Sequence, residues 1–237
     1  MKKFLFTGFL LTLLIWSGCK VTHPSKVVVD PEFKPNEIVS ILIAPFISSI
    51  SEAEDPKRFS ETIMDRVLRE QLAAREDYKF ISTQTFKFAL KKAGLEDRYE
   101  EFKENWIKNH TIDKDFLTKM RLLTNAQTML VPYVYLWYKD QADYREASTA
   151  SSTQVGATLS LVDMTTGKIL WEATDENVKE SVRSEGRTVV SSGGYVRRIE
   201  GVSATGQDIY SAPPFSDVAV MVLQAIVDAF PRKQGIE

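Results

Sequence analysis

The stretch that decides the fold is LSLVDMTTGKILWEA, residues 159–173. Apolar side chains occupy every second position from Val155 to Leu161, which is typical of a strand with one buried face. A turn at 163–167 ends in a glycine, the residue best suited to the positive φ that such loops often need. A second alternating run follows the turn, formed by Ile169, Trp171 and Ala173. The stretch therefore predicts an antiparallel hairpin.

Further strands and helices are predicted on both sides of this hairpin. Runs of β-branched and apolar residues predict strands at 38–47, 78–81 and 129–138. Apolar side chains at helical spacing predict helices at 56–74, 83–93, 113–123 and 217–230, while 96–109 is charged and aromatic and is either irregular or helical. We expect an α/β (α+β) fold, with a single mixed β-sheet of four to five strands packed against three to four helices.

Several single residues carry finer expectations within these elements. Asp55, Thr83 and Ser216 are expected to cap the helices that they precede or open. Leu123 is expected to face inward from its helix. Pro132 is expected to move its strand toward a sheet edge or a bulge, because proline has no backbone N–H to donate to a neighbouring strand.

The N-terminus has the three parts of an export leader. Lys2 and Lys3 are basic, an apolar run extends from Phe4 to Trp16, and small residues precede Cys19, the single cysteine of the chain. This resembles a bacterial lipoprotein leader, which implies cleavage before Cys19 and attachment of acyl chains to its sulfur. Trp16 departs from the usual aliphatic residue at its position. An ordinary secretory leader or an uncleaved anchor stays open as an alternative.

The resemblance of the leader also implies a location. Lys20 follows the cysteine where an aspartate would indicate retention in the inner membrane, so we expect lipid anchoring in the outer membrane, on its periplasmic face. Residues 1–18 are then a signal peptide and residues 19–36 a lipidated tether. Three prolines interrupt this tether, and its Val27–Val29 run is expected to be too brief to build a regular element. Residues 37–237 form the single periplasmic domain.

Composition excludes some classes of function. The 237 residues carry a net charge of −2, so no global field favours nucleic acid or an anionic membrane surface. The chain contains two histidines, His23 and His110, so a histidine-based triad is not expected. His110 with Asp113 and Asp115 could form a metal cluster, although acidic residues are also favourable at a helix N-terminus.

No other catalytic pattern stands out. Glu100 and Glu101 could suggest acid–base work, although a solvated helix face explains paired acids equally well. Neither a P-loop nor a GxSxG sequence occurs. We expect a protein that is not an enzyme and that binds no metal and no cofactor.

The order of elements over 38–230 carries a family resemblance. A first strand ending in APF, the ISTQTF step from strand to helix, the MLVPYVYL strand and the 159–173 hairpin are similar to the envelope lipoproteins related to the curli secretion channel. That superfamily includes lipoproteins that activate penicillin-binding proteins and related bacterial lipoproteins. The resemblance implies a non-catalytic α/β domain that acts on envelope proteins by binding them, with self-association open.

Two polar segments fall where curli-channel proteins insert membrane-spanning hairpins, at 139–154 and 180–211. The second is a long loop rich in Gly and Ser. Its four arginines are candidate partner-binding residues, because guanidinium groups recognise carboxylates and phosphates: Arg183, Arg187, Arg197 and Arg198. Both segments are too polar to make a convincing lipid-facing surface.

These observations predict a non-catalytic, lipid-anchored periplasmic protein that binds partners in envelope assembly, secretion or cell-wall synthesis. The alternative is a ring-forming outer-membrane export channel of the curli-secretion type. The two hypotheses differ in whether the processed domain stays monomeric or assembles into detergent-dependent rings.

Overall fold

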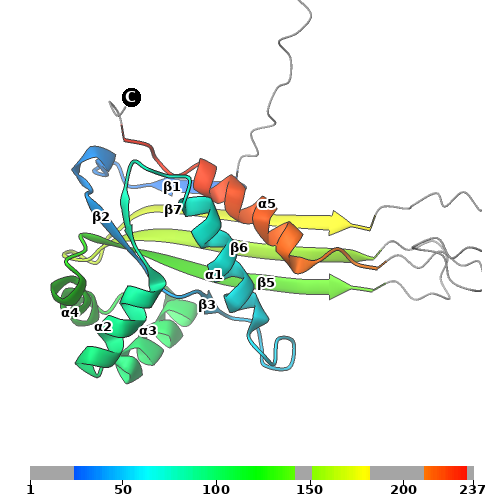
Figure 1. Cartoon of the computed structure of the whole chain (residues 1–237), viewed down its shortest axis with the longest axis horizontal. Coiled ribbons are helices and arrows are strands. Elements are labelled where there is room, and N and C mark those ends of the chain that lie inside the picture. The colour runs from blue at the N-terminus through cyan, green and yellow to red at the C-terminus, as the bar shows by residue number, and fades with distance from the viewer. Residues whose placement is uncertain (1–23, 142–150, 182–210, 234–237) are drawn as a thin grey trace, which may run out of the picture.

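The computed structural model describes residues 24–141, 151–181 and 211–233. One mixed sheet runs through these residues in the order β1-β7-β6-β5-β2-β4, and β3 also pairs with β5 (Figure 1). Neighbours from β1 to β5 are antiparallel, whereas β2 is parallel to both β4 and β5. The strands are β1 (Lys26–Val29), β2 (Ser40–Ile43), β3 (Ile47–Ser48), β4 (Lys79–Ile81), β5 (Thr128–Asp140), β6 (Ser152–Asp163) and β7 (Ile169–Glu180).

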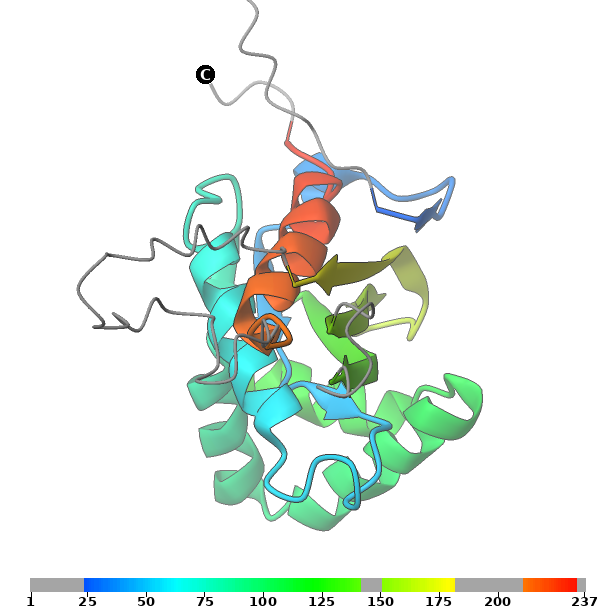
Figure 2. The same cartoon turned by 90° about the vertical axis from the view of Figure 1, so that its right-hand side faces the viewer.

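Helices cover the sheet on both faces, in two separate hydrophobic cores. Helices α1 (Phe59–Leu72) and α5 (Phe215–Asp228) pack on one face, and α2 (Thr83–Ala93), α3 (Glu96–Asn109) and α4 (Lys114–Thr124) on the other (Figure 2). A short 3₁₀ turn, η1 (Pro35–Glu37), precedes β2. The mixed α+β class is confirmed.

The expected number of elements was too low. The sheet has seven strands rather than four to five, and five α-helices are described rather than three to four. One added strand arises because the predicted strand at 38–47 is broken around Pro45. Ile43 pairs with Leu130, and Ile47 pairs with Tyr133. The chain from Ile43 to Ile47 is thus one residue longer than the stretch of β5 beside it, and the extra residue forms a bulge.

The other added strand lies in the stretch expected to be a tether. Residues Lys26–Val29 pair antiparallel with β7 as the sheet's edge strand, so the expectation that Val27–Val29 is too brief to form a regular element is wrong. All four residues are exposed. A neighbouring strand supplies the hydrogen bonds that four residues cannot make by themselves.

The predicted hairpin is confirmed as β6 and β7, joined by the turn at 163–167. Gly167 has a φ of 72°, and the Asp163 carboxylate accepts hydrogen bonds from the N–H groups of Thr165 and Thr166. The expectation that β6 is half-buried was wrong, since nearly every residue from 153 to 162 is buried on either face. The strand lies between β5 and β7, so it has no free edge.

The helix starts differ in detail from those predicted. The Asp55 carboxylate accepts from the N–H groups of Phe59 and Ser60, at 2.8 Å each, although α1 begins only at Phe59. Ser82, rather than Thr83, caps α2. The expected cap at Ser216 was wrong, because α5 already begins at Phe215 after two prolines and no side chain caps it.

One further expectation was wrong, and another was met in one of its two forms, a bulge rather than an edge. Leu123 is 43% exposed instead of facing inward, because the buried face of α4 is formed by Phe116, Leu117 and Met120. Pro132 does not place β5 at an edge. It lies opposite the break between β2 and β3, where the neighbouring strand also lacks regular pairing, and a bulge follows between Val134 and Leu136.

Within the described ranges, no helix is long and apolar enough to cross a membrane.

Candidate protein-docking face

The residues singled out from the sequence lie outside the described part of the chain. Cys19 precedes residue 24, and the four candidate arginines fall between 181 and 211: Arg183, Arg187, Arg197 and Arg198. Lipidation and arginine-mediated binding therefore stay predictions. The described residues offer a different candidate, on the three long strands β5, β6 and β7.

Strands β5, β6 and β7 end together at one tip of the sheet. Asp140 pairs with Ser152, and Ser152 pairs with Glu180, so the three strands stay in register to their ends. Figure 1 shows them running well past helices α2, α3 and α4, which gather at the opposite end of the molecule. The tip has two faces, and they differ in what covers them.

One face of the tip is closed by α5 and the segment before it, and we call it the sealed face. The Trp137 ring stacks on Phe215 with centroids 4.1 Å apart and planes 8° from parallel. The Thr153 hydroxyl donates to the Pro213 carbonyl at 2.6 Å, and the Lys179 ammonium pairs with Asp217 at 2.9 Å. Each of the three long strands thus holds the start of α5.

The far end of α5 is held as well. The Arg75 guanidinium donates to the carbonyls of Val227, Phe230 and Pro231 and pairs with Asp77 at 2.7 Å. A cation at these carbonyls opposes the partial negative charge of a helix C-terminus. Burial acts to raise the pKa of Asp77, but the hydrogen bond and charge of Arg75 outweigh it and hold that pKa below its ordinary value.

No described helix covers the other face of the tip, and we call it the open face. The helices on this side of the sheet contact β2 and β3, and of all the helices only α5, on the sealed side, makes extensive contact with β6 and β7. Tyr138 is 50% exposed and Val178 is 47% exposed. The open face consists of Tyr133, Tyr135, Leu136, Tyr138, Gln154, Glu176 and Val178.

A glycine sets the position of the central tyrosine. A Cβ at Gly156 would lie 2.8 Å from the ring of Tyr135 and 3.0 Å from the Cβ of Leu136, so only glycine lets both side chains lie this close to β6. The Tyr135 ring covers the bare backbone there, and its centroid is 6.1 Å from that of Tyr133. The open face therefore has a fixed aromatic surface rather than loosely held side chains.

Charge on this face is acidic. Burial raises the pKa of Tyr135 to about 12, and the carboxylates of Glu176 and Asp175 add to the shift, so the phenol stays protonated at neutral pH. Glu172 lies on the same side of β7 and accepts a hydrogen bond from the Ser160 hydroxyl at 2.8 Å. A neutral, rigid tyrosine offers both apolar area and a hydrogen-bonding hydroxyl, the combination enriched where proteins bind one another.

The three residues of the possible metal cluster, His110, Asp113 and Asp115, have separate places in the structure. Asp113 caps α4 by accepting from the N–H groups of Asp115 and Phe116, and it pairs with Arg98 at 2.7 Å. His110 ends α3, with its ring 6.2 Å from that of Tyr133. Across the described ranges, no group of three or more His, Cys, Asp or Glu side chains could hold a metal ion.

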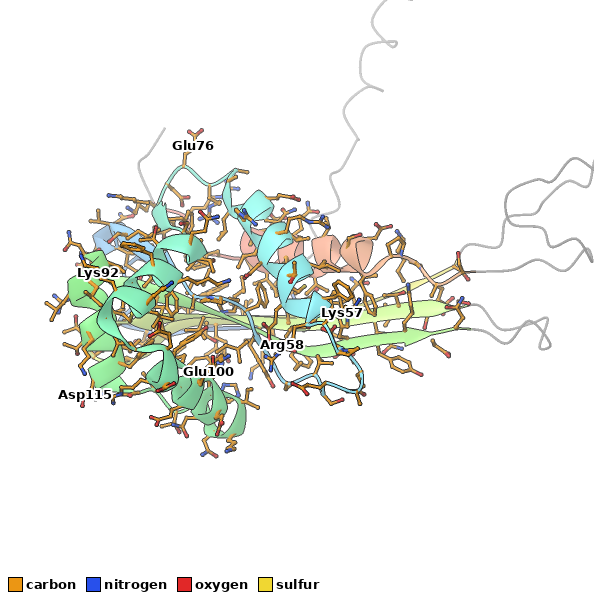
Figure 3. The ribbon with its side chains drawn as sticks, turned by 60° about the horizontal axis from the view of Figure 1, so that its bottom comes forward. Lys57, Arg58, Glu76, Lys92, Glu100 and Asp115 are labelled. Carbon is orange, nitrogen blue, oxygen red and sulfur yellow. The ribbon has the colours of Figure 1, made fainter. Side chains whose placement is uncertain are left out.

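Of the paired acids of α3, Glu100 has a structural partner. Glu100 pairs with Lys103 at 2.5 Å on the helix surface. Arg58 and Glu100 lie on the same side of the molecule (Figure 3). The hydrogen bond and charge of Glu61 have the largest effect in raising the pKa of Arg58, and the charge of Glu100 adds to it. Glu100 therefore has surface electrostatic partners.

A comparison with protein-family models and with curated proteins found no match. Among solved structures, the lipoprotein GNA1162 from Neisseria meningitidis is 19% identical with a TM-score of 0.43, over 62% of this chain and 88% of that one. The PelC dodecamer from Paraburkholderia phytofirmans is 13% identical with a TM-score of 0.36, over 85% and 94%. The LpoB C-terminal domain from Salmonella enterica is 14% identical with a TM-score of 0.35, over 59% and 82%.

The open face was not identified from the sequence, although one signal was present. Tyr133 and Tyr135 stand two residues apart in a strand whose intervening Val134 is fully buried. Alternation of this kind places both rings on one side of the sheet. What it could not show is whether a helix would cover that side.

Proposed function

We propose that this chain is a non-catalytic, lipid-anchored protein of the bacterial outer membrane that binds protein partners in the periplasm through its open face. The observation that carries the proposal is the contrast between the two faces of the β5–β7 tip, one packed against α5 and the other, with Tyr135 and Tyr138 on it, covered by no described helix. Contiguous exposed apolar and aromatic surface on a folded domain is typical of an interaction site.

The chemistry of the open face suits a protein partner better than a lipid surface. Glu172 and Glu176 lie beside the tyrosines, and acidic groups are disfavoured next to anionic headgroups. Tyrosine immobilised on a strand loses little further conformational entropy when a partner binds. A partner with basic or hydrogen-bond-donating groups around an apolar centre would match this face.

The lipid anchor of the proposal rests on the sequence around Cys19. Labelling cells with a radioactive fatty acid should label the wild-type chain, and Cys19→Ala should abolish the label because no other cysteine is available. An unlabelled wild-type chain would contradict lipidation at this site.

Site-specific photo-crosslinking in cells tests the open face directly. A crosslinking amino acid at Tyr138 or Val178 should give a discrete crosslinked band. The same group at Phe88 or Leu122, which are 68% and 79% exposed on α2 and α4, should not. Crosslinks of equal strength at all four positions would show that exposure alone explains them and would reject the open face as the docking surface.

The ring-forming channel remains the second candidate, because β5, β6 and β7 stay in register to a common end. The full chain purified in detergent distinguishes the two. The docking proposal expects light scattering to report a monomer or weak association, whereas the channel requires a closed ring of many copies. A stable ring would replace the docking proposal.

A further inference from the structure

A small cavity lies at the carboxyl ends of two parallel strands. Strands β2 and β4 are parallel neighbours, and the chain leaves β2 toward α1 on one face and β4 toward α2 on the other. A cavity of about 270 Å³ lies at this end of the two strands, with Ile43 of β2 and Ser82, directly after β4, in its lining.

The cavity has an apolar floor and charged walls from two helices. Ile43, at the carboxyl end of β2, and Leu68 of α1 provide the floor. Asp65 and Arg69 extend from α1 and Lys87 from α2. Since α1 and α2 belong to opposite faces of the sheet, the two cations approach the cavity from different sides.

These three charges are not matched with one another. One oxygen of the Asp65 carboxylate accepts the N–H of Phe46 at 3.2 Å, and within the described part of the chain neither Arg69 nor Lys87 forms an ion pair. Both cations are near enough to lower the pKa of Asp65, yet burial has the larger effect and raises it. The carboxylate is thus partly desolvated without a direct cationic partner.

We propose that this cavity binds a small zwitterion of the amino-acid type, with an aliphatic side chain on Ile43 and Leu68. Arg69 and Lys87 would receive its carboxylate, and Asp65 its ammonium group. A simple anion would leave Asp65 without a partner, and a simple cation would leave Arg69 and Lys87 without one, whereas a ligand with both charges satisfies all three side chains.

The size of the cavity limits the ligand. Pockets for drug-sized molecules span roughly 300–1,000 Å³, and this cavity lies just below that range. A free amino acid with a branched aliphatic side chain is of suitable size, whereas a nucleotide or a folded peptide is not.

Calorimetric titration of the full chain in detergent tests the proposal with three matched probes. Leucine carries both charges, N-acetyl-leucine only the carboxylate and leucine amide only the ammonium group. We expect saturable binding of leucine, at least about tenfold tighter than either analogue, because each analogue leaves one charged partner unmatched. Absence of saturable leucine binding, or an analogue that binds as tightly as leucine, would overturn the proposal.

Substitutions then assign the two ends of the ligand. Lys87→Gln should weaken leucine and N-acetyl-leucine about tenfold without weakening leucine amide, whereas Asp65→Asn should weaken leucine and leucine amide without weakening N-acetyl-leucine. Arg66→Gln, an exposed change on α1 away from the cavity lining, is the control and should leave all three unchanged. Equal losses for all probes in either variant would indicate a structural effect and reject the assignment.

Discussion

The two faces of the β5–β7 tip are made by the same three strands but differ in whether a described helix covers them. Trp137 and Tyr138 are neighbours in the chain, but Trp137 is 7% exposed under Phe215 while Tyr138 is 50% exposed on the open face. Both are large aromatic residues of similar strand propensity. The comparison teaches that burial at this tip is decided by α5, a helix that follows much later in the sequence, and not by the strands themselves.

A bulge in β5 decides which aromatic ring goes to which face. Before the bulge, the even-numbered residues Leu130, Pro132 and Val134 lie on the sealed face. After the bulge, the odd-numbered Trp137 lies on the sealed face and Tyr138 on the open face. Without the extra residue at the bulge, strict alternation would place Trp137 on the same side as Tyr133 and Tyr135. The bulge therefore supplies the stacking partner of Phe215 and leaves the tyrosines exposed.

The largest expected difference between the faces comes from shortening these two neighbours. Trp137→Ala should lower the free energy of unfolding by about 3–5 kcal/mol, because it leaves a cavity under α5. Tyr138→Ala should change it by less than about 0.5 kcal/mol. Urea denaturation of both variants measures the difference. Equal losses would show that the open face is covered in solution and would remove the distinction on which the docking proposal depends.

An intermediate effect is expected where the open face lies closest to the sheet. Gly156→Ala should cost about 1–3 kcal/mol, since its new Cβ would lie 2.8 Å from the Tyr135 ring. Combining it with Tyr135→Ala should recover part of that loss, because the ring that obstructs the Cβ is gone. A double-mutant cycle of unfolding free energies checks the coupling, and strictly additive losses would show that the ring is not held against β6.

The sealed face should also show its burial in the pH dependence of stability. Asp175 is buried there, and burial raises the pKa of its carboxyl above the ordinary 3.8, although the Ser25 N–H donates to it. The folded state therefore binds this proton more tightly than the unfolded chain does. The contribution of Asp175 is most favourable below pH 3.8 and declines as the pH rises through the raised value.

Asp175→Asn should remove that decline, since an amide oxygen can still accept from Ser25 and carries no charge. Relative to wild type, the variant should gain stability between about pH 3 and about pH 7. Chemical denaturation at several pH values measures the gain. A variant that loses stability relative to wild type as the pH rises would contradict the raised pKa.

The smallest effect is expected at the rim where the two faces meet. Lys179 and Asp217 form an ion pair while about 40% exposed, so Lys179→Met should cost no more than about 1 kcal/mol. Added salt should reduce this cost further, because exposed charges are screened. Thermal unfolding at low and high ionic strength gives the comparison, and a loss that is large and independent of salt would mean that the pair is essential to closing the sealed face.

Sequence pattern was sufficient for elements whose signal is local. The 159–173 hairpin carries its own alternation and its own turn glycine, and α2 ends at Gly94, which adopts a φ of 60°. Local pattern was insufficient for Val27–Val29, because its hydrogen-bond partners lie in β7. It also misjudged β6, because burial of a central strand on both faces depends on neighbours from elsewhere in the chain.

The candidate sites show the same division. Cys19 was identified because a leader is read in a linear order of residue types, and it stays a prediction. The open face is formed by residues of three strands, and the zwitterion cavity by residues of α1, α2 and β2, so no contiguous motif marks either of them.

By itself, the sequence determined the mixed α+β class, the hairpin at 159–173 and a reasonable set of helix ends, because alternation, helical spacing and capping act over a few residues. Only the tertiary structure decided that β1 joins the sheet, that one extra residue in β5 turns Trp137 inward and Tyr138 outward, and that α5 closes one face and leaves the other open. The physical reason is that burial depends on what packs against a surface, and at this tip the packing partner comes from a distant part of the chain.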